Sequence, residues 1–248
     1  MERRLEGKIA VVTGGGSGIG RVSVLAFVRE GATVVVADKS TENGQETVKM
    51  ALDAGGEAIF TKTDVTKAAE VKAVIERTVK TFGRLDIALN SAGVESVGPS
   101  TIECTEENWD RVININLKGV WLCMKYEIPP MLAIGHGSIV NMSSAAGLIG
   151  FPKIPDYVAS KHGVVGLTRC AALEYAGTGI RVNAICPYAV QTPMNDRIIA
   201  RGRSPKPAPI GRIGTAEEIS EAAVWLSSDA TSFITGHALS VDGGYVAG

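Results

Sequence analysis

Residues 8–20, which read KIAVVTGGGSGIG, decide the fold of this chain. The β-branched run at 8–13 predicts a buried strand, and the pattern over 18–30 predicts a helix after it. Glycines between a strand and a helix let the backbone turn tightly and approach a pyrophosphate, whose negative charge the helix N-terminus favours. The spacing is Gly-x-x-x-Gly-x-Gly, and the candidate phosphate contacts are Gly14, Ser17, Gly18, Ile19 and Gly20. The stretch therefore predicts a dinucleotide site at the carboxyl end of the first strand.

An acidic residue, Asp38, ends the second predicted strand at 33–37, about twenty residues after the glycines. A carboxylate there can accept hydrogen bonds from both ribose hydroxyls of NAD, and it would repel the 2′-phosphate of NADP. Lys39 follows directly and would soften that repulsion, while Ser17 in the loop is neutral. We therefore expect NAD as the cofactor. The alternative is that Asp38 is a solvated acid at a strand end.

Short β-branched runs alternate with longer helical patterns along the chain. Strands are predicted at 8–13, 33–37, 58–62, 87–90, 137–142, 181–185 and 238–241, and helices at 18–30, 41–54, 71–82, 106–132, 156–176 and 215–227. This alternation means parallel strands joined by right-handed crossovers. We expect an α/β Rossmann fold, in which a single doubly wound parallel sheet carries helices on both faces and residues 1–248 form one domain. The Arg- and Pro-rich stretch at about 193–210 is long for a connector, and we interpret it as a mobile substrate lid.

Composition argues against several other functions. The 248 residues carry a formal net charge of −1 and no basic block, so neither nucleic acid nor an anionic membrane is expected as a partner. The longest apolar runs, at 9–12 and 34–37, are too short to cross a bilayer, and the charged N-terminus is unlike a secretory signal. The 4 cysteines and 3 histidines are scattered. We therefore expect no metal site and a reducing, cytoplasmic compartment.

A tyrosine and a lysine four residues apart, Tyr157 and Lys161, share one face of the predicted helix 156–176. A free tyrosine has a pKa of about 10. A nearby ammonium and a helix N-terminus would both lower that pKa toward the range of efficient proton transfer. Alone, Tyr-x-x-x-Lys often marks nothing more than an exposed helix face. With a dinucleotide site in the same chain, the pair predicts a general acid and base.

The strand, the glycine loop, the acidic strand end and the Tyr-x-x-x-Lys pair, in this order, resemble the short-chain dehydrogenase/reductase family from residue 8 to about residue 244. Asn116, rather than Asn114, precedes a leucine as in the family's Asn-Leu pair. Ser144, rather than Ser143, has the family's thirteen-residue spacing to the tyrosine. The resemblance implies a catalytic tetrad of Asn116, Ser144, Tyr157 and Lys161.

The resemblance also extends the cofactor site. Asp64-Val65 resembles the pair whose acid contacts the adenine amino group, and residues 90–93, Asn-Ser-Ala-Gly, resemble the family's Asn-Asn-Ala-Gly, which shapes the adenine pocket. In the loop opened by Pro187, the Val190 backbone and the Thr192 hydroxyl would hold the carboxamide. The implied contacts are Asp64, Val65, Asn90, Ala92, Gly93, Tyr157, Lys161, Pro187, Val190 and Thr192.

Two residues depart from the family pattern. Ser91 replaces an asparagine, which is a mild change. Tyr188 stands where most members have glycine, and its ring would either crowd the nicotinamide or form a wall of the substrate pocket. We count Ser144, Tyr157 and Tyr188 as substrate-binding residues.

By resemblance, Tyr157 takes the hydroxyl proton of an alcohol while its hydride passes to NAD⁺, and Ser144 hydrogen-bonds the substrate oxygen. Lys161 would lower the pKa of Tyr157 and reach the ribose hydroxyls, and the Asn116 carbonyl would anchor a water that leads to solvent. Apolar residues at 148–154 favour a small or medium secondary alcohol or ketone, which could be cyclic. Glu95 and the lid arginines at 197, 201 and 203 are interpreted mainly as solvated charges. The family resemblance also implies a homotetramer.

Two other functions stay open. A 3-oxoacyl-carrier reductase would run the same chemistry in reverse, but it would prefer NADPH, which Asp38 disfavours. A non-catalytic dinucleotide-binding module would have no need for the tetrad.

Overall fold

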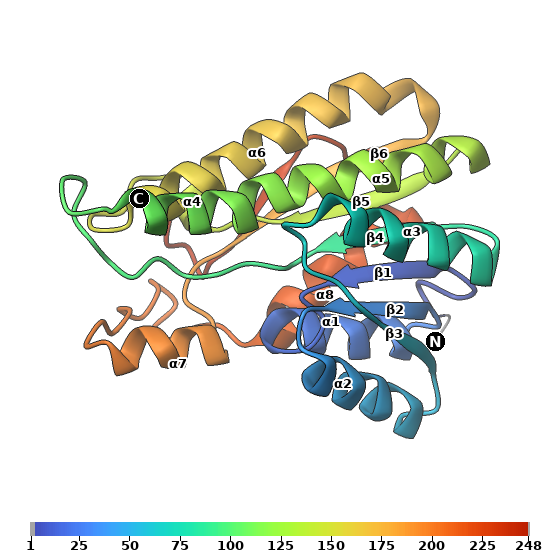
Figure 1. Cartoon of the computed structure of the whole chain (residues 1–248), viewed down its shortest axis with the longest axis horizontal. Coiled ribbons are helices and arrows are strands. Elements are labelled where there is room, and N and C mark those ends of the chain that lie inside the picture. Colours follow the sequence, from blue (N-terminus) through green and yellow to red (C-terminus); the bar gives the residue numbers. More distant parts are fainter. Residues whose placement is uncertain (1–2, 248) are drawn as a thin grey trace.

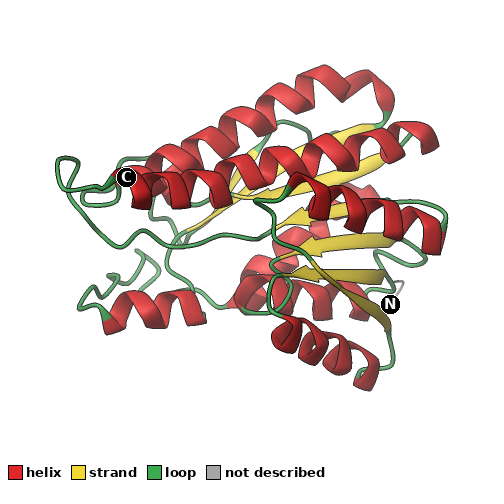
Figure 2. Cartoon of the chain, viewed as in Figure 1, coloured by secondary structure: helices red, strands yellow, loops and turns green. Residues whose placement is uncertain are grey.

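The computed structural model describes residues 3–247, in which seven parallel strands form one sheet (Figures 1 and 2). The strands are β1 Ile9–Thr13, β2 Thr33–Asp38, β3 Glu57–Lys62, β4 Ile87–Asn90, β5 Gly137–Met142, β6 Ile180–Pro187 and β7 Ala238–Val241. Their order is β3-β2-β1-β4-β5-β6-β7. The central strands are almost wholly apolar because both of their faces are covered. The predicted Rossmann architecture is confirmed.

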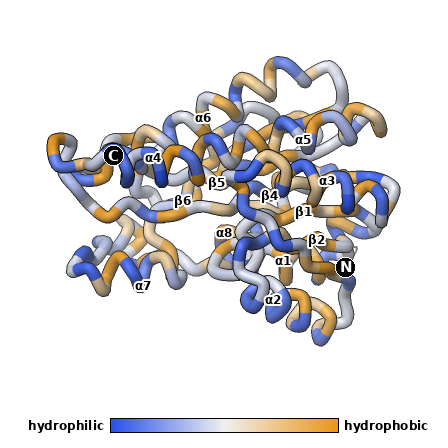
Figure 3. Tube along the Cα trace, in the orientation of Figure 1, coloured by the Kyte–Doolittle hydropathy of each residue, from blue (hydrophilic) through white to orange (hydrophobic). Residues whose placement is uncertain are grey.

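Helices lie on both faces of the sheet, as Figure 1 shows. One face carries α1 Gly18–Arg29, α2 Thr41–Asp53 and α8 Ala216–Ser227, and the other carries α3 Ala68–Phe82, α4 Glu106–Ile113, α5 Gly119–Ile134 and α6 Pro155–Tyr175. Successive strand residues point to opposite faces, so Val11 joins one buried cluster and Val12 the other. Short 3-10 turns occur at Ala145–Gly147, Ala176–Thr178 and Asp229–Thr231. The hydropathy tube of Figure 3 shows the apolar strands between helices that carry polar residues on their outer sides.

The helix predicted over 106–132 is continuous in space but not uniform. Between α4 and α5 the segment Asn114–Lys118 is a π-helix, and α5 continues to Ile134. A π-turn places one extra residue in the helix and often marks a functional site. The prediction of one regular helix was therefore wrong at its centre, because the apolar spacing of the flanking turns does not reveal the inserted residue.

The segment interpreted as a lid also contains regular structure. Residues Pro193–Ala200 form a helix, α7, with Thr192 as its N-cap. This helix lies beyond the carboxyl ends of the strands (Figure 1). The Thr192 side chain accepts a hydrogen bond from the Asn195 backbone N–H at 3.3 Å, and Pro193 occupies the first turn. The sequence pattern missed this helix because it is short. Its role as a mobile lid stays a prediction.

A buried polar network lies behind the end of β4. Asn90 Nδ2 donates to Glu127 Oε2 and to Asn141 Oδ1, both at 3.0 Å, while Asn90 Oδ1 has no partner in the described structure. Burial raises the pKa of Glu127 to about 8. The carboxyl group is therefore protonated at neutral pH.

Glu127 makes the stability of the protein depend on pH. The unfolded chain releases this proton near 4.5, so between pH 4.5 and about 8 the folded state binds more protons and its stability falls as pH rises. We expect Glu127→Gln to remove this fall in the free energy of unfolding, which amounts to at most about 1.4 kcal/mol per pH unit. Urea unfolding at pH 5.5 and 7.5 measures it, with Glu76→Gln on the exposed face of α3 as the control. Equal pH dependence in wild type and Glu127→Gln would contradict the assignment.

Candidate functional site

A cleft of about 1170 Å³ opens at the carboxyl ends of the strands, where the chain leaves β1 and β4 in opposite directions. Open α/β sheets bind their ligands at such a switch point. All the sequence-predicted site residues line this cleft except Asn90 and Asn116. The lining residues among them are Gly14, Ser17, Gly18, Ile19, Gly20, Asp38, Asp64, Val65, Ala92, Gly93, Ser144, Tyr157, Lys161, Pro187, Tyr188, Val190 and Thr192.

The glycine loop has the geometry of a phosphate cradle. Gly14 has φ +67°, and a Cβ there would come within 2.8 Å of the Ala92 backbone. A Cβ on Gly20 would lie 2.1 Å from the Gly14 carbonyl oxygen, so only glycine fits. Ser17 begins α1 without a side-chain capping bond, which leaves the first backbone N–H groups of the helix available for an anion. The loop therefore fits a pyrophosphate.

Asp38 is held in place by backbone groups on both sides. Its Oδ2 accepts from the Gly16 N–H at 2.9 Å, and its Oδ1 accepts from the Ser40 N–H at 2.8 Å. The Arg21 side chain ties the same loop by donating to the Gly16 carbonyl at 2.6 Å. The carboxylate thus lies at the end of β2 where the ribose of a dinucleotide is expected.

The adenine end of the cleft contains Asp64 and Val65 but not the side chain of Asn90. Asp64 Oδ1 accepts from the backbone N–H and the hydroxyl of Thr66, at 2.9 and 2.7 Å. Asn90 is only 1% exposed and contacts Glu127 and Asn141 behind the strand. It can shape the pocket through β4, but it does not line it.

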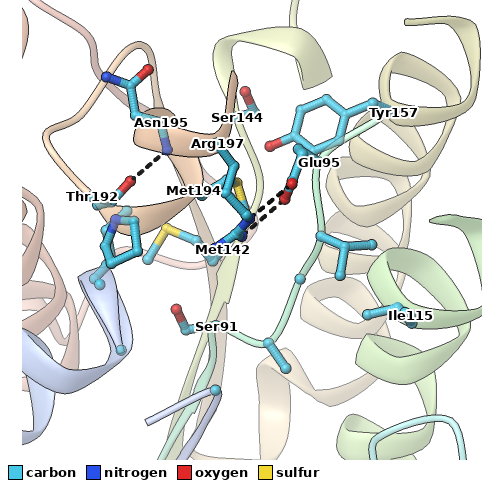
Figure 4. A pocket seen from close by; sticks show the side chains of 18 of the residues that line it. Ser91, Glu95, Ile115, Met142, Ser144, Tyr157, Thr192, Met194, Asn195 and Arg197 are labelled. Atoms are coloured by element: carbon cyan, nitrogen blue, oxygen red, sulfur yellow. Dashed lines mark hydrogen bonds and ion pairs between the residues drawn. The ribbon is translucent and has the colours of Figure 1, made fainter. Parts of the chain in front are cut away.

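Ser144 and Tyr157 face one another across the cleft (Figure 4). Ser144 follows β5, and Tyr157 lies in the first turn of α6. The neighbouring Asp156 fixes that turn, because its Oδ1 accepts from the Tyr157 N–H at 2.8 Å and its Oδ2 accepts from Asn108 of α4. Ser143 is turned away and donates to the Lys161 carbonyl at 2.9 Å. The choice of Ser144 over Ser143 agrees with this geometry.

The sequence predicts a lowered pKa for Tyr157, but the pKa is raised in the folded protein. Burial raises the pKa of Tyr157 to about 12, with Ser144 acting in the opposite direction and Glu95 adding to the rise. Burial also lowers the pKa of Lys161 to about 8. The prediction considered only the attraction between the two groups and left out the cost of removing both from water.

Lys161 lies beneath the tyrosine ring. Its Nζ is 5.5 Å from the ring centroid and donates to the Met142 carbonyl at 2.8 Å. Gly93 lies on the other side, where a Cβ would be 3.8 Å from Nζ. The ammonium is therefore fixed by backbone groups at the floor of the cleft.

Asn116 lies in the π-helix and is fully buried. Its Oδ1 accepts from the Val94 N–H at 2.8 Å, and its Nδ2 donates to the Val94 carbonyl at 2.9 Å. The side chain thus fastens the loop after β4 to the helix. The predicted water on its backbone carbonyl stays a prediction.

Tyr188 forms part of an aromatic wall. Its ring stacks on that of Tyr245, with centroids 3.6 Å apart. The Phe151 ring stacks on both, with its centroid 6.3 Å from that of Tyr188 and 5.7 Å from that of Tyr245. Of the two possibilities left open for Tyr188, this geometry favours the wall. No local pattern around Tyr245 could have predicted the contact, because the two tyrosines lie in separate segments of the chain.

Glu95 is not a solvated charge, so that part of the interpretation was wrong, whereas the side chains of Arg197 and Arg201 stay 51% and 43% exposed. Glu95 is 7% exposed, and Arg197 binds both of its carboxylate oxygens, Nε to Oε1 at 2.9 Å and Nη2 to Oε2 at 3.0 Å (Figure 4). Arg201 Nη1 lies 3.3 Å from Oε1. Burial raises the pKa of Glu95, but these arginines outweigh it and hold the pKa below its ordinary value. The ion pair joins α7 to the loop after β4.

In the predicted nicotinamide loop, the Thr192 hydroxyl makes two hydrogen bonds within the chain. It donates to the Val190 carbonyl at 3.2 Å and caps α7. Val190 pairs with Gly214 in an isolated parallel bridge. Both residues line the cleft, but their binding of a carboxamide stays a prediction.

The described residues also bear on two other features, a metal site and a membrane-spanning helix. Among residues 3–247, no group of three His, Cys, Asp or Glu side chains is placed to hold a metal ion. Within the same range, no helix is long and apolar enough to cross a membrane.

Comparison with known proteins places the chain in a family. Residues 14–246 match the family described as Enoyl-(Acyl carrier protein) reductase. The chain is 43% identical to cyclohexanol dehydrogenase of Acinetobacter sp. over 99% of its own length and 97% of that protein. It is 41% identical to the 3-oxoacyl-[acyl-carrier-protein] reductase of Thermotoga maritima, over 98% and 99%. The crystal structure of levodione reductase superposes with a TM-score of 0.94 at 35% identity, covering 97% of this chain and 98% of that one.

The fold, the cleft and these matches together define an oxidoreductase with an NAD(P) site. The chain belongs to the short-chain dehydrogenase/reductase family.

Proposed function

We propose that the protein is an NAD(H)-dependent oxidoreductase that interconverts a small or medium secondary alcohol and its ketone, with Tyr157 as general acid and base. The observation that carries the proposal is the convergence of Ser144, Tyr157 and Lys161 on one cleft whose other end contains the glycine loop and Asp38. The loop fits the dinucleotide, which exchanges a hydride with the substrate carbon when it is bound.

The remaining chemistry is the transfer of one proton at the substrate oxygen. Ser144 hydrogen-bonds that oxygen and directs it to Tyr157. In reduction the phenol gives its proton to the oxygen, and in oxidation the phenolate removes it. Lys161, fixed on the Met142 carbonyl, places a positive charge beside the ring and favours the phenolate. General acid–base help of this kind contributes roughly 10²–10⁴-fold.

The raised pKa of Tyr157 favours one direction at neutral pH. With a pKa of about 12, the phenol is protonated, which is the form needed to donate to a ketone. Oxidation needs the other form. We therefore propose that oxidation of the alcohol gains more from alkaline pH than reduction of the ketone does.

We propose NAD rather than NADP on the position of Asp38. Its carboxylate is fixed by the Gly16 and Ser40 N–H groups at the end of β2 and cannot turn away without breaking them. A 2′-phosphate would meet that charge directly, and Lys39 offsets it only in part.

A cyclic substrate is supported by Phe151 and Tyr188, whose rings line the cleft and offer flat apolar surface to a carbon skeleton, with Tyr245 stacked on Tyr188. Cyclohexanol dehydrogenase and levodione reductase, to which the chain is similar, have names that refer to cyclic compounds.

A second candidate is a reductase of 3-oxoacyl groups on a carrier protein, which similarity to the Thermotoga enzyme supports. Asp38 argues against the NADPH that such an enzyme would be expected to prefer. A non-catalytic module is disfavoured because Ser144, Tyr157 and Lys161 share the cleft.

A substrate panel separates these candidates. Cyclohexanol, cyclohexanone and a 3-oxoacyl thioester are assayed with NAD(H) and NADP(H) by absorbance at 340 nm. We expect turnover of the cyclic pair with NAD(H) at least about 100-fold above NADP(H), because a fixed carboxylate faces the 2′-phosphate. Preference for the thioester with NADPH would favour the carrier reductase, and no turnover with tight NADH binding would favour the module.

A homotetramer stays a proposal from the family resemblance. On α6, Gly163 packs within the chain, because a Cβ there would lie 2.7 Å from Leu117. Gly166 on the same helix faces open space, where a second copy could approach.

A further inference from the structure

We infer that the substrate end of the cleft is a subsite for a carboxylate, so that the preferred substrate is a secondary alcohol with a carboxylate at its far end. The inference rests on the proposed function and names the substrate class more closely. It is carried by the charges on α7 and on the loop that follows it.

The two ends of the cleft differ in charge. At the adenine and ribose end, Asp38 and Asp64 lie among Lys39, Lys67 and Lys118, so positive charges exceed negative ones by one. At the substrate end the only acidic lining residue among those described is Glu95, whereas four lining residues are arginines. These are Arg111, Arg197, Arg201 and Arg203. With Lys161 beside Tyr157, five positive charges against one negative leave a surplus of four at this end.

Glu95 occupies only part of this positive surface. It gives both carboxylate oxygens to Arg197, while Arg201 reaches one of them through a single Nη1 contact at 3.3 Å. A guanidinium has five N–H donors, so Arg201 retains most of its own. The single carboxylate of Glu95 therefore offsets one positive charge, mainly that of Arg197, and leaves the other arginines in excess.

Arg203 has no acidic partner within residues 3–247. Its guanidinium lies over Gly98, where a Cβ would come within 2.4 Å of Nη1, so the absence of a side chain at Gly98 gives it room. Arg111 is different, because its Nη2 donates to the Glu95 carbonyl and to Asn108 Oδ1. Arg201 and Arg203 are thus the two arginines best placed to bind an added anion.

The shape of the cleft fits an anion that also carries a carbon skeleton. Ser144 and Tyr157 mark the position of the reacting hydroxyl, and Arg197 reaches toward them from α7 in Figure 4. Phe151, Ile154 and Tyr188 line the same end with apolar surface. A hydroxy acid would place its hydroxyl at Tyr157, its skeleton on the apolar wall and its carboxylate on the arginines, where a paired, bidentate geometry is available.

The test compares 4-hydroxycyclohexanecarboxylate with its uncharged methyl ester. For the wild type we expect kcat/KM to be about tenfold or more higher on the acid, and this preference to shrink as salt is raised. The double variant Arg201→Gln/Arg203→Gln should lose about tenfold on the acid and less than about twofold on the ester. Arg3→Gln/Arg29→Gln, at two exposed arginines outside the cleft, is the charge-matched control.

Glu95→Gln tests the same inference with the opposite sign. Removing the competing carboxylate leaves Arg197 and Arg201 free for the substrate, so KM for the acid should fall several-fold while KM for the ester stays within about twofold. Equal kinetic constants for acid and ester in the wild type, or equal losses on both in the arginine variant, would overturn the subsite. A matching rise in the Kd of NADH in that variant would assign the arginines to the cofactor and overturn it as well.

A binding measurement separates this inference from the proposed function. Calorimetry with cyclohexanecarboxylate, which has no hydroxyl to oxidise, is carried out on the Tyr157→Phe protein with and without Arg201→Gln/Arg203→Gln. Arginine-dependent binding by this variant, together with no turnover of either alcohol by the wild type, would support the subsite and refute the dehydrogenase. Turnover of both alcohols without arginine-dependent binding would support the dehydrogenase and refute the subsite.

Discussion

Replacing Tyr157 with phenylalanine is expected to lower kcat by about 10³-fold or more while the Kd of NADH changes by less than about threefold. Phenylalanine keeps the ring and its position over Lys161, whose Nζ lies 5.5 Å from the centroid. Only the hydroxyl that faces Ser144 is removed. No other described side chain in the cleft presents a hydroxyl beside Ser144 as Tyr157 does, so no group can replace the proton donor.

Stopped-flow absorbance at 340 nm gives the rate of hydride transfer, and fluorescence titration gives NADH binding. Tyr175→Phe is a matched control, because Tyr175 ends the same helix and packs in the core away from the cleft. We expect that control to retain kcat within about twofold. If Tyr157→Phe kept most of its kcat, Tyr157 would not be the general acid.

The pH dependence of the reaction follows from the same residues. Burial alone would leave Tyr157 protonated across the neutral range, as its pKa of about 12 indicates. The phenolate becomes more populated as pH rises toward that value, so oxidation should accelerate with pH. Lys161 has a pKa of about 8 and loses its charge over part of the same range, which limits the gain.

The sequence predicted the parts of the molecule in which one local pattern determines the structure. The apolar run before the glycines can only be a buried strand, and the glycines at 14 and 20 are required by contacts of 2.8 and 2.1 Å that a Cβ would make. The same holds for the parallel sheet with helices on both faces, because alternating elements of this length allow few topologies. The element boundaries differ from the predicted ones by a few residues at most for the elements that were predicted.

What the sequence did not predict depends on contacts between distant segments or on burial. Glu95 and Arg197 are 102 residues apart, so neither residue's surroundings in the sequence show that Arg197 pairs with a buried Glu95. Asn116 was identified as a tetrad member, but the π-turn that turns its side chain onto Val94 has no signature in the helical period. The pKa of Tyr157 had the wrong predicted sign because desolvation depends on the tertiary structure.

Replacing Asp38 with asparagine is expected to change the cofactor preference by about 100-fold or more. Asparagine has nearly the same size and keeps one oxygen for the Gly16 N–H, but its NH2 group cannot accept from the Ser40 N–H, so one of the two bonds that hold the side chain is lost. The charge is lost, and with it the proposed charge-assisted bond to the ribose, which would be worth about 1.5–3 kcal/mol. The kcat/KM for NAD should fall by about 10- to 100-fold, while that for NADP should rise because its 2′-phosphate no longer meets a carboxylate.

Two further variants show whether this effect comes from the charge at the end of β2. Asp64→Asn removes the other carboxylate of the cofactor end, which Thr66 holds at 2.7 and 2.9 Å, and it should weaken NAD and NADP by the same factor. Adding Lys39→Ala to Asp38→Asn should reverse part of the gain with NADP, because Lys39 lines the cleft beside Asp38 and its positive charge attracts a 2′-phosphate. If Asp38→Asn lowered kcat/KM for both cofactors equally, Asp38 would act only by bracing the glycine loop through Gly16, and the preference for NAD would need another origin.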